Sequence, residues 1–210
     1  MEGLNHVVYL VDDDRRVLNS LTRLLQGEGW TTQAFISASD FLEAHHPDVP
    51  GCLVLDLMMP EMTGLQVQAE LQRQGQCRPV IFLSGRAEIP ACASAMKAGA
   101  LEFLTKPVEA HLLFRAVTVA LERDAAARKQ NVERREISDR MSSLTVRERQ
   151  VLSGVVEGLL NKQIANRLGI VEKTVKVHRA HAISKLGVRS TAALVRMVYS
   201  LGPEGNAPNP

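Results

Sequence analysis

The chain has 210 residues, of which 45% are apolar and 23% charged, with a formal net charge of +2. This is ordinary globular composition and allows one or two domains. No apolar run approaches the ~18 residues that a membrane span needs, and the N-terminus is acidic where a signal peptide would be basic. We therefore expect a cytoplasmic protein without a membrane partner. Its three cysteines, Cys52, Cys77 and Cys92, are too scattered for a disulfide framework or a metal site.

The charge is divided unevenly along the chain. Residues 1–122 carry nine Lys/Arg and fifteen Asp/Glu, a net −6, whereas residues 123–210 carry sixteen and eight, a net +8. A basic second half attracts polyanions, nucleic acid first. The predicted organisation is an acidic domain at 1–122, a helical linker at 123–141, a basic DNA-binding domain at 142–201 and a disordered tail at 202–210.

The first half alternates short apolar runs with helical patterns. The runs lie at 6–11, 31–35, 52–57, 80–84 and 101–105. They are typical of strands buried on both faces of a sheet. Helical stripes follow near 17–25, 41–44, 65–71 and 90–98. Strict alternation predicts an α/β doubly wound, five-stranded parallel sheet of the flavodoxin-like class.

The second half reads as helix throughout. There is no Pro or Gly from 108 to 152, so we expect one long helix, or two nearly joined, to cross between the domains. Beyond it, an all-α domain of four short helices is predicted at 145–158, 162–168, 172–186 and 191–201.

Polar residues follow the predicted strands at their carboxyl ends. Asp12 and Asp13 follow the first strand, Asp56 lies near the end of the third, Ser84 ends the fourth and Lys106 follows the fifth. These positions converge on one edge of a doubly wound sheet. Clustered carboxylates suit Mg²⁺, beside which an aspartate can attack phosphorus. The residues thus predict a phosphoryl-accepting pocket, in which Ser84 and Lys106 bind phosphoryl oxygens.

An aspartate at a strand end is more often a helix cap than a functional residue. Asp14 is predicted to have this role, capping the helix that begins at Arg15. Capping does not explain the whole set of strand-end residues.

Four motifs resemble the receiver domain of two-component response regulators: VDDD at 11–14, DLMMPEMTG at 56–64, LSG at 83–85 and KAGALEFLTKP at 97–107. The resemblance implies a partner sensor histidine kinase that phosphorylates Asp56. It implies a cis peptide bond before Pro107. It also assigns the pocket residues: Mg²⁺ ligands Asp12, Asp13, Asp56 and the Met58 carbonyl, switch residues Ser84 and Phe103, and phosphate-binding Lys106.

Phosphorylation adds negative charge and strong acceptors to such a pocket. Ser84 would be drawn toward them, and the Phe103 ring would fill the space it leaves, although Phe103 is equally compatible with a core aromatic. The affected surface, residues 87–103 with Met96, Lys97 and Glu102, is the expected dimer contact.

A second constellation surrounds the tight turn at 169–171. The predicted inward face comprises Leu160, Ile164, Ala165, Leu168, Val175, Leu186 and either His178 or Ala182. The following helix carries Lys173, Thr174, Lys176, Arg179 and Lys185 against a single acid, Glu172. This is a helix-turn-helix arrangement whose second helix enters the major groove. A basic amphipathic helix also fits a solvated face or a membrane surface.

The segment from Leu144 to Ser190 resembles the LuxR-type DNA-binding domain, and with the receiver it indicates the FixJ/NarL family. The resemblance implies promoter DNA and RNA polymerase as partners and a homodimer when phosphorylated. It makes Thr174, Lys176 and Val177 base-facing candidates, Lys173 and Arg179 phosphate contacts, and Asn161, Lys162 and Arg189 backbone contacts. Val171 stands where the family often has Ser or Thr, which removes an N-cap worth ~1 kcal/mol. His178 and His181 lack further ligands, which favours packing or phosphate contact over metal binding.

Three functions remain open at this point. The first is a transcriptional regulator that dimerises when Asp56 is phosphorylated, although release of an occluded DNA-binding domain is an alternative route. The second is a DNA-binding protein whose receiver works without phosphorylation. The third, an aspartyl-phosphate phosphatase, requires a second Asp two residues after the nucleophile, where this chain has Met58. We therefore expect no enzyme activity beyond slow hydrolysis of the protein's own phosphoaspartate.

Overall fold

The computed structural model describes residues 6–85, 95–188 and 190–200. The chain divides into two compact units, Met1–Arg128 and Lys129–Pro210. This division falls inside the segment predicted as a linker. The tail predicted at 202–210 lies outside the described residues.

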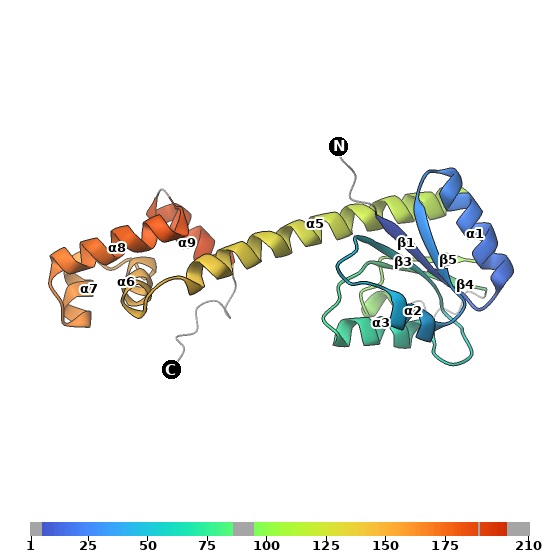
Figure 1. Ribbon diagram of the computed structural model, residues 1–210, viewed down its shortest axis with the longest axis horizontal. Helices are drawn as coiled ribbons and strands as arrows, with labels where there is room; N and C mark the ends of the chain where they lie inside the picture. Colours follow the sequence, from blue (N-terminus) through green and yellow to red (C-terminus); the bar gives the residue numbers. More distant parts are fainter. Residues whose placement is uncertain (1–5, 86–94, 189, 201–210) are drawn as a thin grey trace. The chain divides into compact units, whose positions relative to one another are not determined.

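The first unit is built on a parallel sheet of five strands in the order β2-β1-β3-β4-β5 (Figure 1). The strands are β1 Val7–Val11, β2 Thr31–Phe35, β3 Gly51–Asp56, β4 Val80–Ser84 and β5 Glu102–Thr105. The strand order steps outward in both directions from β1 and β3, so both faces of the sheet need helical cover. The predicted doubly wound sheet is confirmed.

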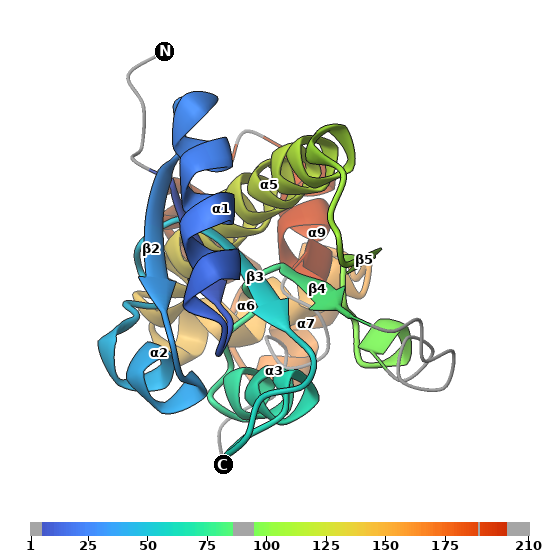
Figure 2. The ribbon, with the colours of Figure 1, turned by 90° about the vertical axis from the view of Figure 1, so that its right-hand side faces the viewer.

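Helices cover both faces of this sheet (Figure 2). Helix α1, Arg15–Gly27, and the start of α5, Ala110–Ser142, pack on one face, and α2, Ala38–Ala44, and α3, Gly64–Arg73, pack on the other. Most of the helix predicted at 90–98 lies outside the described residues. Gly99, predicted to end that helix, has a positive φ of 84°, a conformation that glycine adopts without strain.

The burial of the strands differs from the prediction at both edges of the sheet. Strands β1, β3 and β4 are buried along their whole length, as expected. In β2, Thr31, Gln33 and Ala34 are exposed, and in β5 only Leu104 is buried. Each of these strands pairs with a single neighbour, and edge strands receive less cover than central ones. The prediction that these two strands are buried on both faces is therefore wrong.

Helix α5 is a single helix of 33 residues, one of the two forms that the sequence allowed. Its first turns bury Leu113, Val117 and Ala120 against the sheet. From 129 to 140 every side chain is exposed except the half-buried Ile137. The helix thus changes from an amphipathic element to a polar one along its length.

The second unit contains the four predicted helices: α6 Val146–Val156, α7 Asn161–Leu168, α8 Glu172–Leu186 and α9 Thr191–Ser200. Gly154 on α6 allows close packing with α7, since a Cβ there would lie 2.8 Å from the Ile164 side chain. Gly169 makes the turn between α7 and α8 with a φ of 65°. One predicted inward residue is wrong: Leu160 is 70% exposed, because it precedes the first turn of α7 as its N-cap.

Candidate phosphorylation pocket and nucleic-acid interface

Three predicted pocket residues meet at the carboxyl edge of the sheet. Asp12 and Asp56 are 1% and 5% exposed. The Lys106 ammonium lies 2.5 Å from Asp12 Oδ2 and 2.6 Å from Asp56 Oδ1. The strands that carry the two aspartates are neighbours, while Lys106 comes from the end of the edge strand β5. The sheet topology therefore places one cation between two buried carboxylates.

Burial and the neighbouring charges shift the pKa values of Asp56 and Lys106. Burial raises the pKa of Asp56, and the like charge of Asp12 adds to this, while Lys106 opposes both. Burial alone would lower the pKa of Lys106, but its two carboxylate partners hold it above the usual value. Two carboxylates against one ammonium leave the pocket with net negative charge, which suits a further cation.

The turns that follow the strands hold the two aspartates in place. The Met58 backbone N–H donates to Asp56 Oδ2 at 2.9 Å, and the Asp14 N–H donates to Asp12 Oδ1 at 2.9 Å. Each carboxylate thus offers its second oxygen to Lys106. Gly64 is required beside this pocket, since a Cβ there would lie 2.5 Å from the Asp56 carbonyl oxygen.

The structure places the remaining receiver residues as follows. Ser84 is buried at the end of β4, and Phe103 is half-buried against the core that α2 and α3 cover. Asp13 and Met58 are exposed. Among residues 6–85, 95–188 and 190–200, no three His, Cys, Asp or Glu side chains are grouped as a metal site. The four-ligand Mg²⁺ set stays a prediction.

Two local predictions about this edge are confirmed. Asp14 caps α1, since its side chain accepts the Arg16 N–H at 2.8 Å. The bond between Lys106 and Pro107 is cis. On the predicted dimer surface, Met96 and Lys97 are exposed and Glu102 is half-buried; residues 87–94 are not described.

Helix α8 presents the predicted DNA-contacting residues to different extents. Lys173, Lys176 and Val177 are exposed, and Thr174 is half-buried. Lys176 pairs with Glu172 one turn earlier, with its Nζ 3.1 Å from Oε1. The N-cap position Val171 makes no side-chain bond, as predicted, yet the helix still begins at Glu172.

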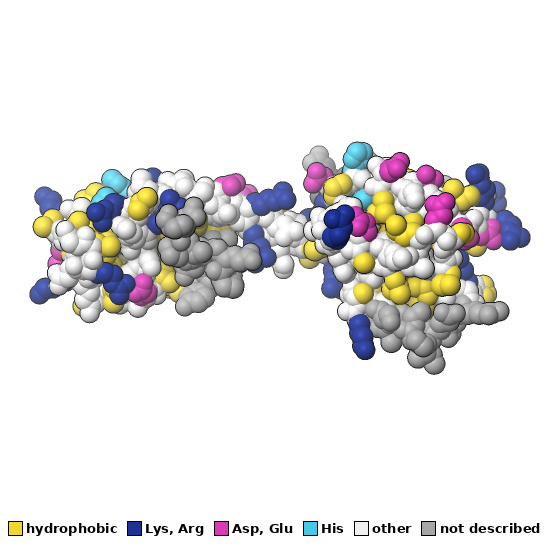
Figure 3. All heavy atoms as spheres, turned by 90° about the horizontal axis from the view of Figure 1, so that it is seen from below, with side chains coloured by type: hydrophobic (Ala, Val, Ile, Leu, Met, Phe, Trp, Pro, Cys, Tyr) yellow, Lys and Arg dark blue, Asp and Glu magenta, His cyan; other side chains and the backbone are white. Residues whose placement is uncertain are grey.

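Two residues predicted to contact the phosphates or backbone of DNA join the two helices of the motif. Arg179 Nη1 donates to Asn161 Oδ1 at 3.2 Å, which links α8 to the first residue of α7. Lys162 beside it is exposed. Arg189 lies outside the described residues. In Figure 3, Lys and Arg side chains outnumber acidic ones on the visible surface of this unit.

One member of the predicted basic face has a different role. Lys185 Nζ lies 2.7 Å from Oε2 of the buried Glu148 and 3.3 Å from the Ser143 carbonyl oxygen. This pair lowers the pKa of Glu148 to about 2, with further hydrogen bonds from Thr145. The Thr145-x-x-Glu148 spacing is a capping-box signature, and it is the sequence signal for the role of Glu148. Lys185 therefore stabilises the fold of the domain.

Comparisons with known proteins match both halves of the chain. Residues 8–118 match the response regulator receiver domain, and residues 142–198 match the luxR family of bacterial regulatory proteins. The chain is 42% identical over 205 residues to the response regulator protein TodT of Pseudomonas putida, covering 95% of this chain and 90% of TodT. It is 40% identical over 199 residues to the transcriptional regulatory protein FixJ of Rhizobium meliloti, covering 94% and 97%.

Solved structures give the same result. The response regulator StyR superposes with a TM-score of 0.83 at 44% identity, covering 92% of this chain and 98% of StyR. Full-length FixJ from B. japonicum gives a TM-score of 0.57 at 34% identity, covering 94% and 97%.

The fold and the two sites define a DNA-binding transcription regulator controlled through a receiver domain. The chain belongs to the FixJ/NarL family of two-component response regulators. The receiver implies a sensor kinase as partner, and the luxR-family domain implies DNA binding. No helix in the described part of the chain is long and apolar enough to cross a membrane.

Proposed function

We propose that a sensor histidine kinase transfers a phosphoryl group to Asp56. An Asp56 carboxylate oxygen attacks phosphorus, and the bond from phosphorus to the kinase histidine breaks. The observation that carries this proposal is the pair of buried carboxylates that share Lys106. Asp56 lies at the end of β3, and Lys106 can pair with a phosphoryl oxygen as it now pairs with the carboxylates.

The residues of this pocket fit Mg²⁺, which receiver domains generally bind at the acidic pocket. Mg²⁺ in proteins is held by one or two carboxylates together with water, and Asp12 and Asp56 supply two with incomplete charge compensation. Asp13 and the Met58 carbonyl oxygen complete the proposed ligand set. When bound, the metal neutralises charge on the phosphoryl oxygens.

The proposed output is a homodimer bound to promoter DNA. Ser84 moves toward the phosphoryl group, Phe103 fills the vacated space, and the surface around Met96, Lys97 and Glu102 forms the dimer contact. Two DNA half-sites about one helical turn apart favour binding by a dimer over binding by a monomer. The proposed DNA contacts are Asn161, Lys162, Lys173, Thr174, Lys176, Val177, Arg179 and Arg189. The complex then recruits RNA polymerase in the cytoplasm.

We propose no enzyme activity toward other substrates. The position two residues after Asp56 is Met58, and its side chain cannot act as a general acid. Slow hydrolysis of the protein's own phosphoaspartate is expected.

Intact mass spectrometry tests the acceptor directly. The full chain is incubated with Mg²⁺ and a small-molecule phosphoryl donor, and the gain of one phosphoryl group is followed. Asp56→Asn should take up none, whereas Asp40→Asn, which changes an exposed carboxylate, should react like the parent. Equal uptake by Asp56→Asn would refute Asp56 as the acceptor.

A further inference from the structure

The segment between α2 and β3 is held by side chains from distant parts of the first unit. Arg128 on α5 donates from Nη2 to the carbonyl oxygens of Pro47 at 2.8 Å and Val49 at 3.1 Å, and from Nη1 to that of Asp48 at 3.0 Å. Three successive carbonyl groups thus share one guanidinium, whose planar array of donors suits several acceptors at once.

Two further groups complete this binding. Arg78, before β4, donates from Nη2 to the carbonyl oxygens of His46 at 2.9 Å and Val49 at 3.1 Å. The Val7 N–H donates to the Pro50 carbonyl oxygen at 2.9 Å. Every carbonyl group from His46 to Pro50 therefore accepts a hydrogen bond from outside the segment.

Asp124 connects this segment to the helix. It is 3% exposed, and its Oδ2 accepts the Gly51 N–H at 2.9 Å and Arg128 Nε–H at 2.7 Å. A buried carboxylate needs such partners, because leaving it unpaired is costly. No side chain fits at Gly51, where a Cβ would lie 1.9 Å from the Val7 carbonyl oxygen.

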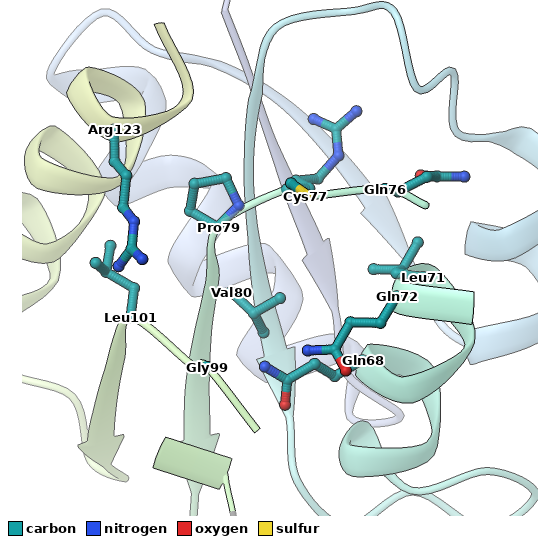
Figure 4. Close-up of a pocket in the computed structure, with 11 residues that line it drawn as sticks. Gln68, Leu71, Gln72, Gln76, Cys77, Pro79, Val80, Gly99, Leu101 and Arg123 are labelled. Carbon is teal, nitrogen blue, oxygen red and sulfur yellow. The ribbon is translucent and has the colours of Figure 1, made fainter. Parts of the chain in front are cut away.

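Arg123 adds a contact on the same turn of α5. It lines a pocket at the amino end of β4 together with Pro79 and Leu101 (Figure 4). Arg123 thus lines this pocket, and Asp124 and Arg128 bond the segment before β3 and its first residue, although the sequence placed all three in the linker. The first compact unit accordingly ends at Arg128.

The strands relate these contacts to the phosphorylation pocket. Strand β1 starts at Val7 and is followed by Asp12, and β3 starts at Gly51 and ends at Asp56. Both strands that deliver a pocket carboxylate therefore begin where α5 is held. The starts of these strands are thus joined by hydrogen bonds to the segment that Asp124 and Arg128 hold.

We propose that Asp124 and Arg128 form a clamp, the α5 clamp, that makes residues 123–128 a fixed part of the receiver and couples its phosphorylation to DNA binding. These are positioning residues: they touch neither the phosphoryl group nor DNA. If this stretch of α5 frayed, it would take up a change in the receiver locally, whereas a fixed stretch passes the change on to the residues that follow. The coupling rests on the function proposed above, but the fixing of residues 123–128 to the receiver does not.

Amide hydrogen exchange on the full chain tests whether residues 123–128 are fixed to the receiver. Arg128→Met removes the guanidinium, Asp124→Asn removes the charge, and Lys129→Met removes an exposed cation one residue further on. In the first two variants the amides of Gly51 and of 121–128 should exchange at least about tenfold faster, given the strength of charge-assisted hydrogen bonds. The Lys129→Met chain should match the parent. Unchanged exchange at Gly51 in both clamp variants would overturn the clamp.

DNA binding tests the coupling. The probe is a duplex with two half-sites selected using the phosphorylated parent, and Kd is measured with and without phosphorylation. The clamp variants should take up phosphoryl groups like the parent and bind equally when unphosphorylated, but lose most of the gain in affinity. Arg128→Lys keeps the ion pair without the carbonyl contacts and should restore part of the gain.

The outcomes separate the two proposals. A full gain in Arg128→Met, with exchange at Gly51 already accelerated, would overturn the coupling and leave a purely structural clamp. If the parent itself gains no affinity on phosphorylation, the proposed function fails and the coupling with it. The exchange measurement still decides whether residues 123–128 are fixed to the receiver.

Discussion

The ammonium of Lys106 lies 2.6 Å from the Oδ1 of Asp56 and joins the edge strand β5 to the central strand β3 at the sheet's carboxyl edge. Lys106 lowers a pKa that burial raises. In Lys106→Gln burial acts without that opposition, so the pKa of Asp56 should rise further. NMR titration of the Asp56 carboxyl carbon measures this, with Lys97→Gln as an exposed control. A pKa of Asp56 that stays at the parent value would contradict the assigned pairing.

The ion pair between Glu148 and Lys185 predicts a pH dependence of the second unit. The pKa of Glu148 is lowered from 4.5 to about 2 in the folded state. The stabilisation that ionised Glu148 gives the folded state is therefore complete above pH 4.5 and is lost as the pH falls toward 2. Glu148→Gln should lower the free energy of unfolding at pH 7, and the difference from the parent should shrink below pH 4.5. Denaturant unfolding checks this, with the exposed Glu133→Gln as control.

Glu172 is expected to oppose DNA binding. It is the only acid on α8 and pairs with Lys176, a proposed base contact. Glu172→Gln frees Lys176 and removes a negative charge from the helix that is proposed to contact DNA. An exposed pair of this kind is weak, so Kd should fall only about two- to fivefold. Fluorescence anisotropy at two salt concentrations measures this. Weaker binding by Glu172→Gln would show that this turn does not face DNA.

Gly64 should tolerate no side chain. A Cβ there would lie 2.5 Å from the Asp56 carbonyl oxygen and 2.8 Å from the Phe82 ring. Gly64→Ala should destabilise the receiver by roughly 1–3 kcal/mol, the usual cost of overpacking. At Gly27 a Cβ meets nothing within 4 Å, so Gly27→Ala should unfold like the parent. Urea denaturation of both variants gives the comparison. Equal stability of Gly64→Ala and the parent would mean that the backbone around residue 64 shifts to make room for the methyl group.

The pocket was predictable because parallel strands bring their carboxyl ends together. Asp12 and Lys106 each follow a strand and Asp56 ends one, so topology alone places them side by side. The exposure of β2 was not predictable in this way, because an apolar Phe35 and β-branched residues look alike in central and edge strands. Which strand lies at an edge is a property of the whole sheet.

Other features depend on contacts between distant positions. Asp124 and Gly51 are 73 residues apart in the chain, and Asp124 lies in a helix whose other charges point to a solvated linker. Lys185 belongs by sequence to a basic face and by contact to Glu148. No local pattern distinguishes a buried, paired charge from an exposed one, which is why the α5 clamp became visible only in the structure.

The central proposal is that Asp56 controls DNA binding, and one titration tests this directly. The parent chain and Asp56→Asn are each treated with a phosphoryl donor and Mg²⁺ and titrated onto a selected duplex with two half-sites. The parent should bind more tightly after treatment, with steep salt dependence, and Asp56→Asn should not change. A similar gain in affinity in Asp56→Asn, or none in the phosphorylated parent, would contradict the account.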